Sequence, residues 1–206
     1  MVLALCRGGS LCDTMGRALT SRLPMAEAKV HSTFCQLCGA LHYCHRHGVV
    51  HRDIKLDNLC WSEPSERTLI LIDFGYAATT NSLSNFAGSP HYAAPEVHKT
   101  LQVGDHLFVG TQADVFSAGV CLFAMLATQL PFGGGEDTTE ERRALSAKVC
   151  SGEWDEPPEW SQLERVPAAL DLVAAMLRVD PDMRFCLDDV CAHPWISGPD
   201  ALPWRG

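Results

Sequence analysis

Apolar residues recur every three or four positions through most of the chain, which is typical of amphipathic helices. The clearest case lies between Pro24 and Gly48, where a proline precedes a long helical pattern and a glycine ends it. Its apolar stripe comprises Val30, Phe34, Leu37, Leu41 and Cys44. The same spacing predicts further helices over residues 11–19, 112–129, 140–150, 167–177 and 187–192. Residues 112–129 are apolar on all sides, so we expect a buried core helix there.

Two short stretches depart from helical spacing. Residues 58–61 and 68–72 are separated by the turn-rich sequence of residues 62–65, which predicts two short strands. Residues 76–92 and 97–111 are polar and longer than most connections, so we expect functional loops there. No repeat or linker divides the chain. We therefore predict a single, mainly α-helical unit with short β-hairpins.

Composition and charge narrow the range of functions. The chain has 206 residues, a formal net charge of -9 and a sequence pI near 5.4. Because no stretch concentrates lysine and arginine, no nucleic acid partner is indicated. The longest apolar run, residues 119–130, is shorter than the roughly 20 residues that a membrane span needs, and the first residues lack a signal-peptide pattern. We expect a soluble, intracellular protein of the cytoplasm, with the nucleus as the alternative.

The chain is rich in cysteine. Ten cysteines would suggest disulfides in a small secreted protein, but in an intracellular chain of this size we expect reduced thiols. One group of cysteines and histidines raises the alternative of a zinc site. It comprises Cys35, Cys38, His42, Cys44, His45 and His47. These residues would be scattered around one helix, whereas structural zinc ligands converge from turns, so the helix is the preferred interpretation.

The candidate chemistry lies directly after the long helix, in the sequence HRDIKLDN at residues 51–58. Asn58, together with Asp73 after the second strand-like stretch, would offer the hard oxygen ligands that Mg²⁺ prefers. Asp53 then remains as an acid–base group for a hydroxyl nucleophile, and Lys55 can neutralise charge on a transferring phosphoryl group. The alternative interpretation is a polar surface loop without a catalytic role.

These motifs resemble the protein kinase superfamily. Residues 51–58 are similar to its catalytic loop, and residues 73–75 (DFG) to its metal-binding motif. Four further motifs follow in the order of the family, at residues 94–96 (APE), 114–119, 180–184 and 193–195. Lys55 and residues 88–96 favour the serine/threonine branch, in particular the calcium/calmodulin-dependent and AMP-activated group.

The resemblance implies transfer of the γ-phosphoryl group of ATP to a serine or threonine of a protein substrate, with Mg²⁺ as the metal. Asp53 would orient and deprotonate the acceptor hydroxyl, and Lys55 would stabilise the developing charge. The other implied contacts are Asn58 and Asp73 to Mg²⁺ and its nucleotide, and Leu5, Cys6 and Cys60 to adenine.

Three structural contacts are also implied by the resemblance. Ser89 would bond to the two catalytic side chains, and Asp114 would accept backbone N–H bonds from the catalytic loop. Glu96 and Arg184 would form a buried ion pair. The alternatives are a helix cap for Asp114 and two unrelated surface charges for Glu96 and Arg184.

The chain departs from the family at its beginning. Residues 2–11 are similar to the fifth strand and hinge of a kinase, so we expect residues 1–206 to be an incomplete kinase domain, a large lobe with the small lobe truncated. The sequence has no Gly-rich loop, phosphate-binding lysine or regulatory-helix glutamate. The alternative function is therefore a catalytically inactive, pseudokinase-like binding module. The helical face or the exposed small-lobe edge of the first strand would be the surface for such a partner.

The segment that ends at residues 94–96 resembles the activation segment of a kinase, and it also departs from the related kinases. Asn85 stands where that group commonly has a phosphorylatable threonine. Arg52 remains available to bind a phosphate, with Ser82 or Ser84 as alternative acceptors. We predict that activity does not depend on phosphorylation at position 85.

Overall fold

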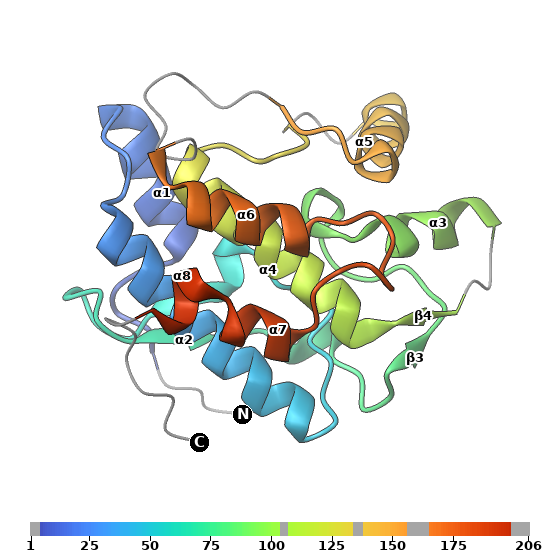
Figure 1. The fold of residues 1–206 in the computed structure, drawn as a ribbon, viewed down its shortest axis with the longest axis horizontal. Helices are drawn as coiled ribbons and strands as arrows, with labels where there is room; N and C mark the ends of the chain where they lie inside the picture. The colour runs from blue at the N-terminus through green and yellow to red at the C-terminus, as the bar shows by residue number, and fades with distance from the viewer. Residues whose placement is uncertain (1–4, 104–106, 134–137, 156–164, 199–206) are drawn as a thin grey trace.

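The computed structural model describes residues 5–103, 107–133, 138–155 and 165–198, and most of them are helical (Figure 1). The α-helices are α1 (Leu11–Ser21), α2 (Glu27–Arg46), α3 (Pro95–Val103), α4 (Gly110–Ala127), α5 (Thr139–Ser151), α6 (Pro167–Met176), α7 (Leu187–Ala192) and α8 (Pro194–Ser197). The strands are β1 (Leu59–Trp61), β2 (Leu69–Leu71), β3 (Ser82–Leu83) and β4 (Phe108–Val109), with short 3-10 helices η1 (Leu56–Asn58), η2 (Phe74–Tyr76) and η3 (Pro90–Tyr92). The predicted class, mainly α-helical with short hairpins, is confirmed.

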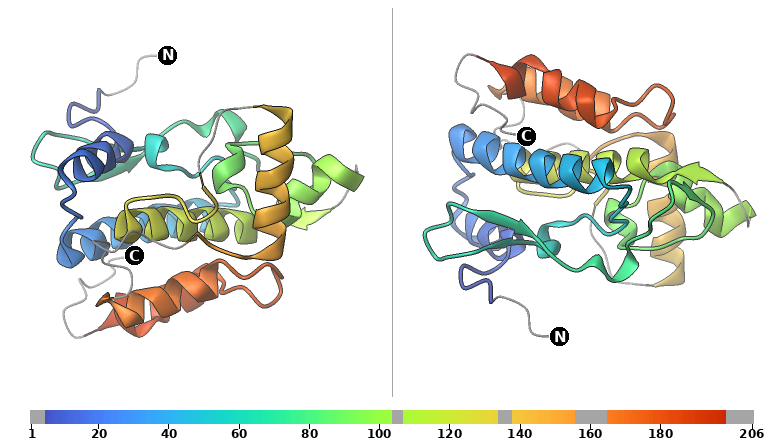
Figure 2. Two further views of the ribbon diagram at one scale, coloured as in Figure 1. Left: turned by 90° about the horizontal axis from the view of Figure 1, so that it is seen from above. Right: turned by 90° about the horizontal axis from the view of Figure 1, so that it is seen from below.

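Helix α4 lies at the centre of the hydrophobic core. It packs against α2 and α6, which run alongside it (Figure 2). The stripe predicted for α2 is buried over four of its positions, whereas Cys44 in the last turn is only half-buried. Among the described helices, α4 alone is long and apolar enough to cross a membrane, and 89% of it is buried inside the protein. Helix α4 is therefore a core helix.

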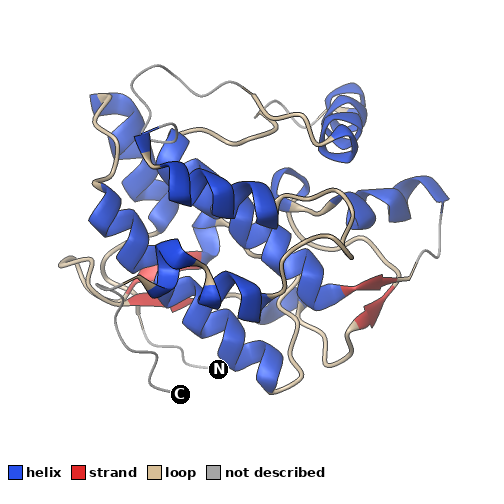
Figure 3. Ribbon diagram, in the orientation of Figure 1, coloured by secondary structure: helices blue, strands red, loops and turns tan. Residues whose placement is uncertain are grey.

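Two short antiparallel sheets of two strands each, of which only the first is a hairpin, are well separated in the molecule (Figure 3). In the first, β1 pairs with β2 so that Leu59 lies opposite Leu71. This hairpin confirms the strands predicted at residues 58–61 and 68–72. In the second, β3 pairs with β4, and Ser82 lies opposite Val109.

The prediction of a loop over residues 97–111 is wrong, because α3 and β4 occupy most of that segment. The residues that α3 buries include Glu96, His98 and Thr100, whose polar side chains find hydrogen-bond partners inside the protein. Hydrophobic spacing is a poor signal for a helix that buries such side chains. The predicted loop at residues 76–92 likewise contains β3 and η3.

Candidate active site

The loop that follows α2 is held by hydrogen bonds at its start and by hydrogen bonds to helix α4 in the core. Val50 and Ala78 exchange two backbone hydrogen bonds of 2.9 Å, which tie the beginning of the loop to the activation segment. Asp114 in α4 accepts the backbone N–H groups of His51 and Arg52, each at 2.8 Å. The predicted role of Asp114 as an anchor is therefore confirmed.

A third partner of Asp114 was not predicted from the sequence. The Nε2 atom of His45 lies 2.9 Å from the Asp114 carboxylate. The two residues are 69 positions apart, so no local pattern could indicate their contact. Two backbone donors and one imidazole therefore converge on a single buried carboxylate behind the loop.

Asp53 is the buried carboxylate of this loop, with only 3% of its side chain exposed. Its Oδ2 atom lies 3.0 Å from both Lys55 Nζ and Asn58 Nδ2. Its Oδ1 atom accepts the backbone N–H of Ser89 at 2.9 Å. Burial would raise the pKa of Asp53, but the hydrogen bonds from Lys55, Ser89 and Asn58 outweigh it and lower the pKa below its usual value. The carboxylate is thus kept ionised at neutral pH.

Lys55 links the catalytic loop to the activation segment. Its Nζ atom donates a 2.8 Å hydrogen bond to the Ser89 hydroxyl while it contacts Asp53. The predicted bonds from Ser89 to Asp53 and Lys55 are therefore confirmed. Gly88 makes this approach sterically feasible, because a Cβ atom there would lie 2.2 Å from the Arg52 carbonyl oxygen, and its φ is +89°.

The first hairpin brings Asn58 and Asp73 to the same end. The backbone N–H of Ile72 bonds to the Asn58 carbonyl at 2.9 Å, so Asp73 follows directly beside Asn58. The side-chain nitrogen of Asn58 donates to the carbonyl oxygen and the carboxylate of Asp53, and these two bonds do not use its amide oxygen. The carboxylate of Asp73 is exposed, and its backbone is left-handed with φ 60°. Two hard oxygen donors of this kind fit Mg²⁺, which takes its remaining ligands from water and phosphate.

The expected ion pair between Glu96 and Arg184 is present and buried. Arg184 donates two parallel hydrogen bonds to the Glu96 carboxylate, at 2.6 and 2.9 Å. The side chains are 3% and 0% exposed. The pair joins the beginning of α3 to the segment before α7, so it holds the end of the activation segment against the core.

Arg52 has a partner in the activation segment that was not predicted. Its Nη2 atom donates to the carbonyl oxygen of Asn85 at 3.1 Å and to its side-chain oxygen at 2.8 Å. The arginine is left-handed, with φ 70°. Burial lowers the pKa of Arg52, and the nearby Asp114 opposes the shift. The Arg52 guanidinium was expected to remain available for a phosphate, but it is hydrogen-bonded to the uncharged Asn85.

The structure brings only some of the residues expected near adenine close together. Gly8 donates its backbone N–H to the Trp61 carbonyl at 3.1 Å, and Ser10 bridges to Cys60. Cys60 is therefore adjacent to the segment that follows Leu5 and Cys6. Leu5 is 79% exposed and Cys6 is half-buried. The start of the expected first strand, residues 1–4, lies outside the described residues.

The Ser10 side chain caps α1. Its hydroxyl accepts the backbone N–H of Asp13 at 3.0 Å, and the Asp13 carboxylate accepts the backbone N–H of Ser10 at 2.9 Å. This reciprocal arrangement is a capping box. In the described part of the chain, no three His, Cys, Asp or Glu side chains are grouped so that they could hold a metal ion.

The mainly helical fold and the arrangement around Asp53 resemble the large lobe of a kinase, and comparison with known families shows the family. The model for the protein kinase domain matches residues 1–196. The chain belongs to the protein kinase family. The predicted recognition from the catalytic-loop and DFG motifs is confirmed.

Similar proteins are also kinases. The chain is 37% identical over 176 residues to the sucrose non-fermenting protein kinase 1 of Fusarium virguliforme, covering 84% of this chain and 23% of the relative. It is 34% identical over 201 residues to the maternal embryonic leucine zipper kinase of Xenopus tropicalis, covering 95% and 28%. It is 31% identical over 182 residues to the NUAK family SNF1-like kinase 1 of Mus musculus, covering 87% and 25%. The chain thus spans about a quarter of the length of these relatives. They agree with the predicted likeness to the AMP-activated group.

Proposed function

We propose that the protein transfers the γ-phosphoryl group of ATP to a serine or threonine hydroxyl of a protein substrate. The observation that carries this proposal is the buried carboxylate of Asp53, held by Lys55, Asn58 and Ser89 at 2.9–3.0 Å. A fixed carboxylate of this kind can orient an acceptor hydroxyl and take its proton as the new bond forms.

Lys55 is the proposed electrostatic partner of the transferred group. Its ammonium group lies 3.0 Å from Asp53 and 2.8 Å from the Ser89 hydroxyl, so it is held at the edge of the position that the acceptor would take. A positive charge there stabilises the charge that develops on the phosphoryl oxygens. Lys55 also supports the serine/threonine assignment, because its residue type at this position favours that branch of the family.

Protein kinases act with ATP and Mg²⁺. In this chain we assign the metal to the side-chain oxygens of Asn58 and Asp73, which the first hairpin places next to each other. When bound there, Mg²⁺ would neutralise charge on the nucleotide phosphates. We assign the adenine contacts to the backbone of Leu5 and Cys6, with Cys60 beneath the ring.

Replacing Asp53 by Asn tests the catalytic assignment. The substitution keeps the size of the side chain and removes the charge, so phosphotransfer should fall by about 100-fold or more. The assay follows radiolabelled phosphate from ATP into a protein substrate, with the chain joined to a complete small lobe. Asp182→Asn removes an exposed carboxylate far along the chain and is the matched control. A rate for Asp53→Asn within a few-fold of this control would refute the assignment.

Replacing Asp73 by Ala tests the metal assignment. The change removes a direct oxygen ligand, so titration calorimetry should show weaker binding of ATP in the presence of Mg²⁺. Binding of ATP without Mg²⁺ should change little, because the metal contact is then absent in both proteins. An unchanged affinity with Mg²⁺ would mean that Asp73 has only a structural role.

The proposal extends to the domain and its setting. We propose that residues 1–206 act as the large lobe of a kinase domain in the cytoplasm, and that a protein partner binds at its small-lobe edge. All ten cysteines are free thiols, which fits a reducing compartment. The arrangement around Asp53 favours an enzyme over the catalytically inactive binding module.

A further inference from the structure

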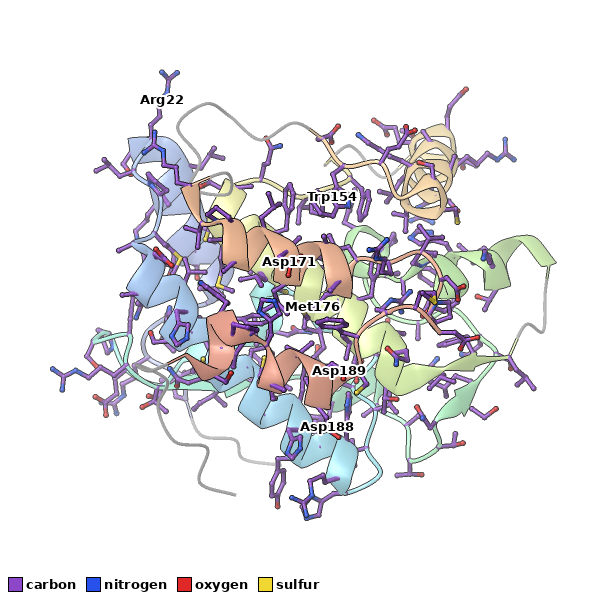
Figure 4. All side chains as sticks on the ribbon, viewed as in Figure 1. Arg22, Trp154, Asp171, Met176, Asp188 and Asp189 are labelled. Carbon is purple, nitrogen blue, oxygen red and sulfur yellow. The ribbon has the colours of Figure 1, made fainter. Side chains whose placement is uncertain are left out.

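Three histidines are buried in the described part of the chain, namely His51, His98 and His193. In His51 and His193 both ring nitrogens are hydrogen-bonded. Their partners are Ile72 and Asp53 for His51, and Trp195 and Asp171, the last labelled on α6 in Figure 4, for His193. His98, in the first turn of α3, differs from both.

His98 donates one hydrogen bond and leaves its other nitrogen unpaired. Its Nε2 atom lies 3.0 Å from the backbone carbonyl oxygen of Pro90, and a carbonyl oxygen only accepts, so Nε2 carries the proton. The Nδ1 atom is buried and has no hydrogen-bond partner among the described residues. Burying an unpaired nitrogen costs free energy that a leucine at this position would avoid. The bond to Pro90 is therefore what a histidine supplies here.

The Pro90 carbonyl does not depend on His98 for a donor, because it also accepts the backbone N–H of Ala93 at 3.2 Å. The bond from His98 is instead a link between α3 and the segment of residues 86–92. The ring of Phe86, in the same segment, lies 5.9 Å from the ring of His98, centre to centre. His98 thus contacts this segment at two points, one on each side of Ser89.

Residues 86–92 lie against the proposed active site. The backbone N–H of Ser89 bonds to Asp53 at 2.9 Å, and the Ser89 hydroxyl accepts a bond from Lys55 at 2.8 Å. A substrate chain whose hydroxyl reaches Asp53 therefore passes beside this segment.

Helix α3 gives His98 a fixed position. The buried pair of Glu96 with Arg184 ties the start of the helix to the core, and His98 follows Glu96 by two positions. We propose that His98 is a positioning residue for the protein substrate, because its bond to Pro90 holds residues 86–92 in the orientation that receives the acceptor. This inference rests on the proposed function. In it, His98 acts through Pro90 and not on the reacting groups themselves.

Hydrogen exchange of the 206-residue chain tests the contact without any need for activity. His98→Leu fills the space and removes the donor, so the backbone amides of residues 86–92 should exchange about 3–10-fold faster, which corresponds to the net contribution of one hydrogen bond. His98→Gln offers an amide N–H in place of Nε2 and should keep the slow exchange. Thr100→Val is the matched control, because the buried hydroxyl that it removes bonds only within α3, to the Val97 carbonyl.

Steady-state kinetics test the effect on the substrate, with the chain joined to a complete small lobe. His98→Leu should raise the KM for the protein substrate about 3–10-fold and leave kcat and the KM for ATP unchanged, as expected when a binding contact is lost without a change in the chemical step. His98→Gln should restore the KM of the unaltered protein. A role in stability alone predicts the same kinetics for His98→Leu and Thr100→Val.

Three results would overturn the proposal. One is exchange over residues 86–92 that is no faster in His98→Leu than in Thr100→Val. Another is an equal effect of His98→Gln and His98→Leu, because the bond to Pro90 would then have no part in it. The third is a KM for the protein substrate that stays unchanged although exchange has become faster.

The two readouts separate this inference from the proposed function. An unaltered protein that transfers no phosphate would refute the proposed function, and the exchange rates would still show whether His98 holds residues 86–92. If the His98→Leu chain does not fold, His98→Asn takes its place, since the shorter asparagine side chain cannot span the distance to Pro90.

Discussion

Replacing Arg184 by Met is expected to lower the free energy of unfolding by about 3–5 kcal/mol, the usual cost of leaving one member of a buried ion pair without its partner. Arg184 makes two hydrogen bonds to Glu96 and two more, to the carbonyl oxygens of Gln112 at 2.8 Å and Arg178 at 3.0 Å. Methionine fills much of the same volume but provides none of these donors. The dominant cost is the Glu96 carboxylate, which stays buried without a positive charge nearby.

The assay is urea unfolding, with an exposed ion pair as the control. Arg17 lies 2.7 Å from Glu66, but 61% of its side chain is exposed, so Arg17→Met should cost less than about 1 kcal/mol. The double variant Glu96→Gln with Arg184→Met should cost less than the sum of the two single changes, since each alone strands the other group. If Arg184→Met costs no more than Arg17→Met, the reasoning from burial is refuted.

Three further predictions concern the activation segment and its surroundings. Burial lowers the pKa of His98, so the unfolded chain binds the proton more readily; its contribution to stability is complete above about pH 6.5 and is lost as the pH falls below that value. Urea unfolding between pH 5 and 7 should show a smaller pH dependence for His98→Gln than for the unaltered protein, and equal slopes would contradict this. Asn85→Ala should lower the rate of phosphotransfer several-fold, because it removes the side-chain partner of Arg52. Phosphatase treatment of the unaltered protein should leave the rate unchanged. A rate that drops after phosphatase treatment would show that a phosphate is needed. Gly88→Ala should lower the free energy of unfolding by about 1–3 kcal/mol, since it adds a side chain at φ +89° against the Arg52 carbonyl, and unaltered urea unfolding would argue against that contact.

Much of the helical framework was predictable because it buries apolar side chains at regular spacing. The stripe of α2 from Val30 to Leu41 is an example, and the prediction of residues 187–192 coincides with α7. Helix α3 was not predicted because it buries polar side chains, whose hydrogen-bond partners become apparent only in the folded structure. Hydrophobic periodicity reports burial of apolar groups and carries no information about such pairs.

The candidate site shows the same division. Contacts that follow from motifs, such as Glu96 with Arg184, were predicted from the resemblance to kinases. The contacts of His45 with Asp114 and of Asn85 with Arg52 were not, because each joins polar residues that are far apart in sequence. Long-range polar contacts depend on how the elements pack, which a single sequence does not display.

The left-handed backbones of Arg52 and Asp73 set stability and activity against each other. A residue other than glycine held in this conformation costs about 1–3 kcal/mol, which the surrounding structure must offset. Glycine at either position would relax the backbone and strengthen the fold, but it would also remove the guanidinium that holds Asn85 or the carboxylate assigned to Mg²⁺. Selection for thermal stability alone would therefore favour replacement of both residues. Screens for more stable variants of this protein should accordingly yield substitutions at these two positions that lower activity.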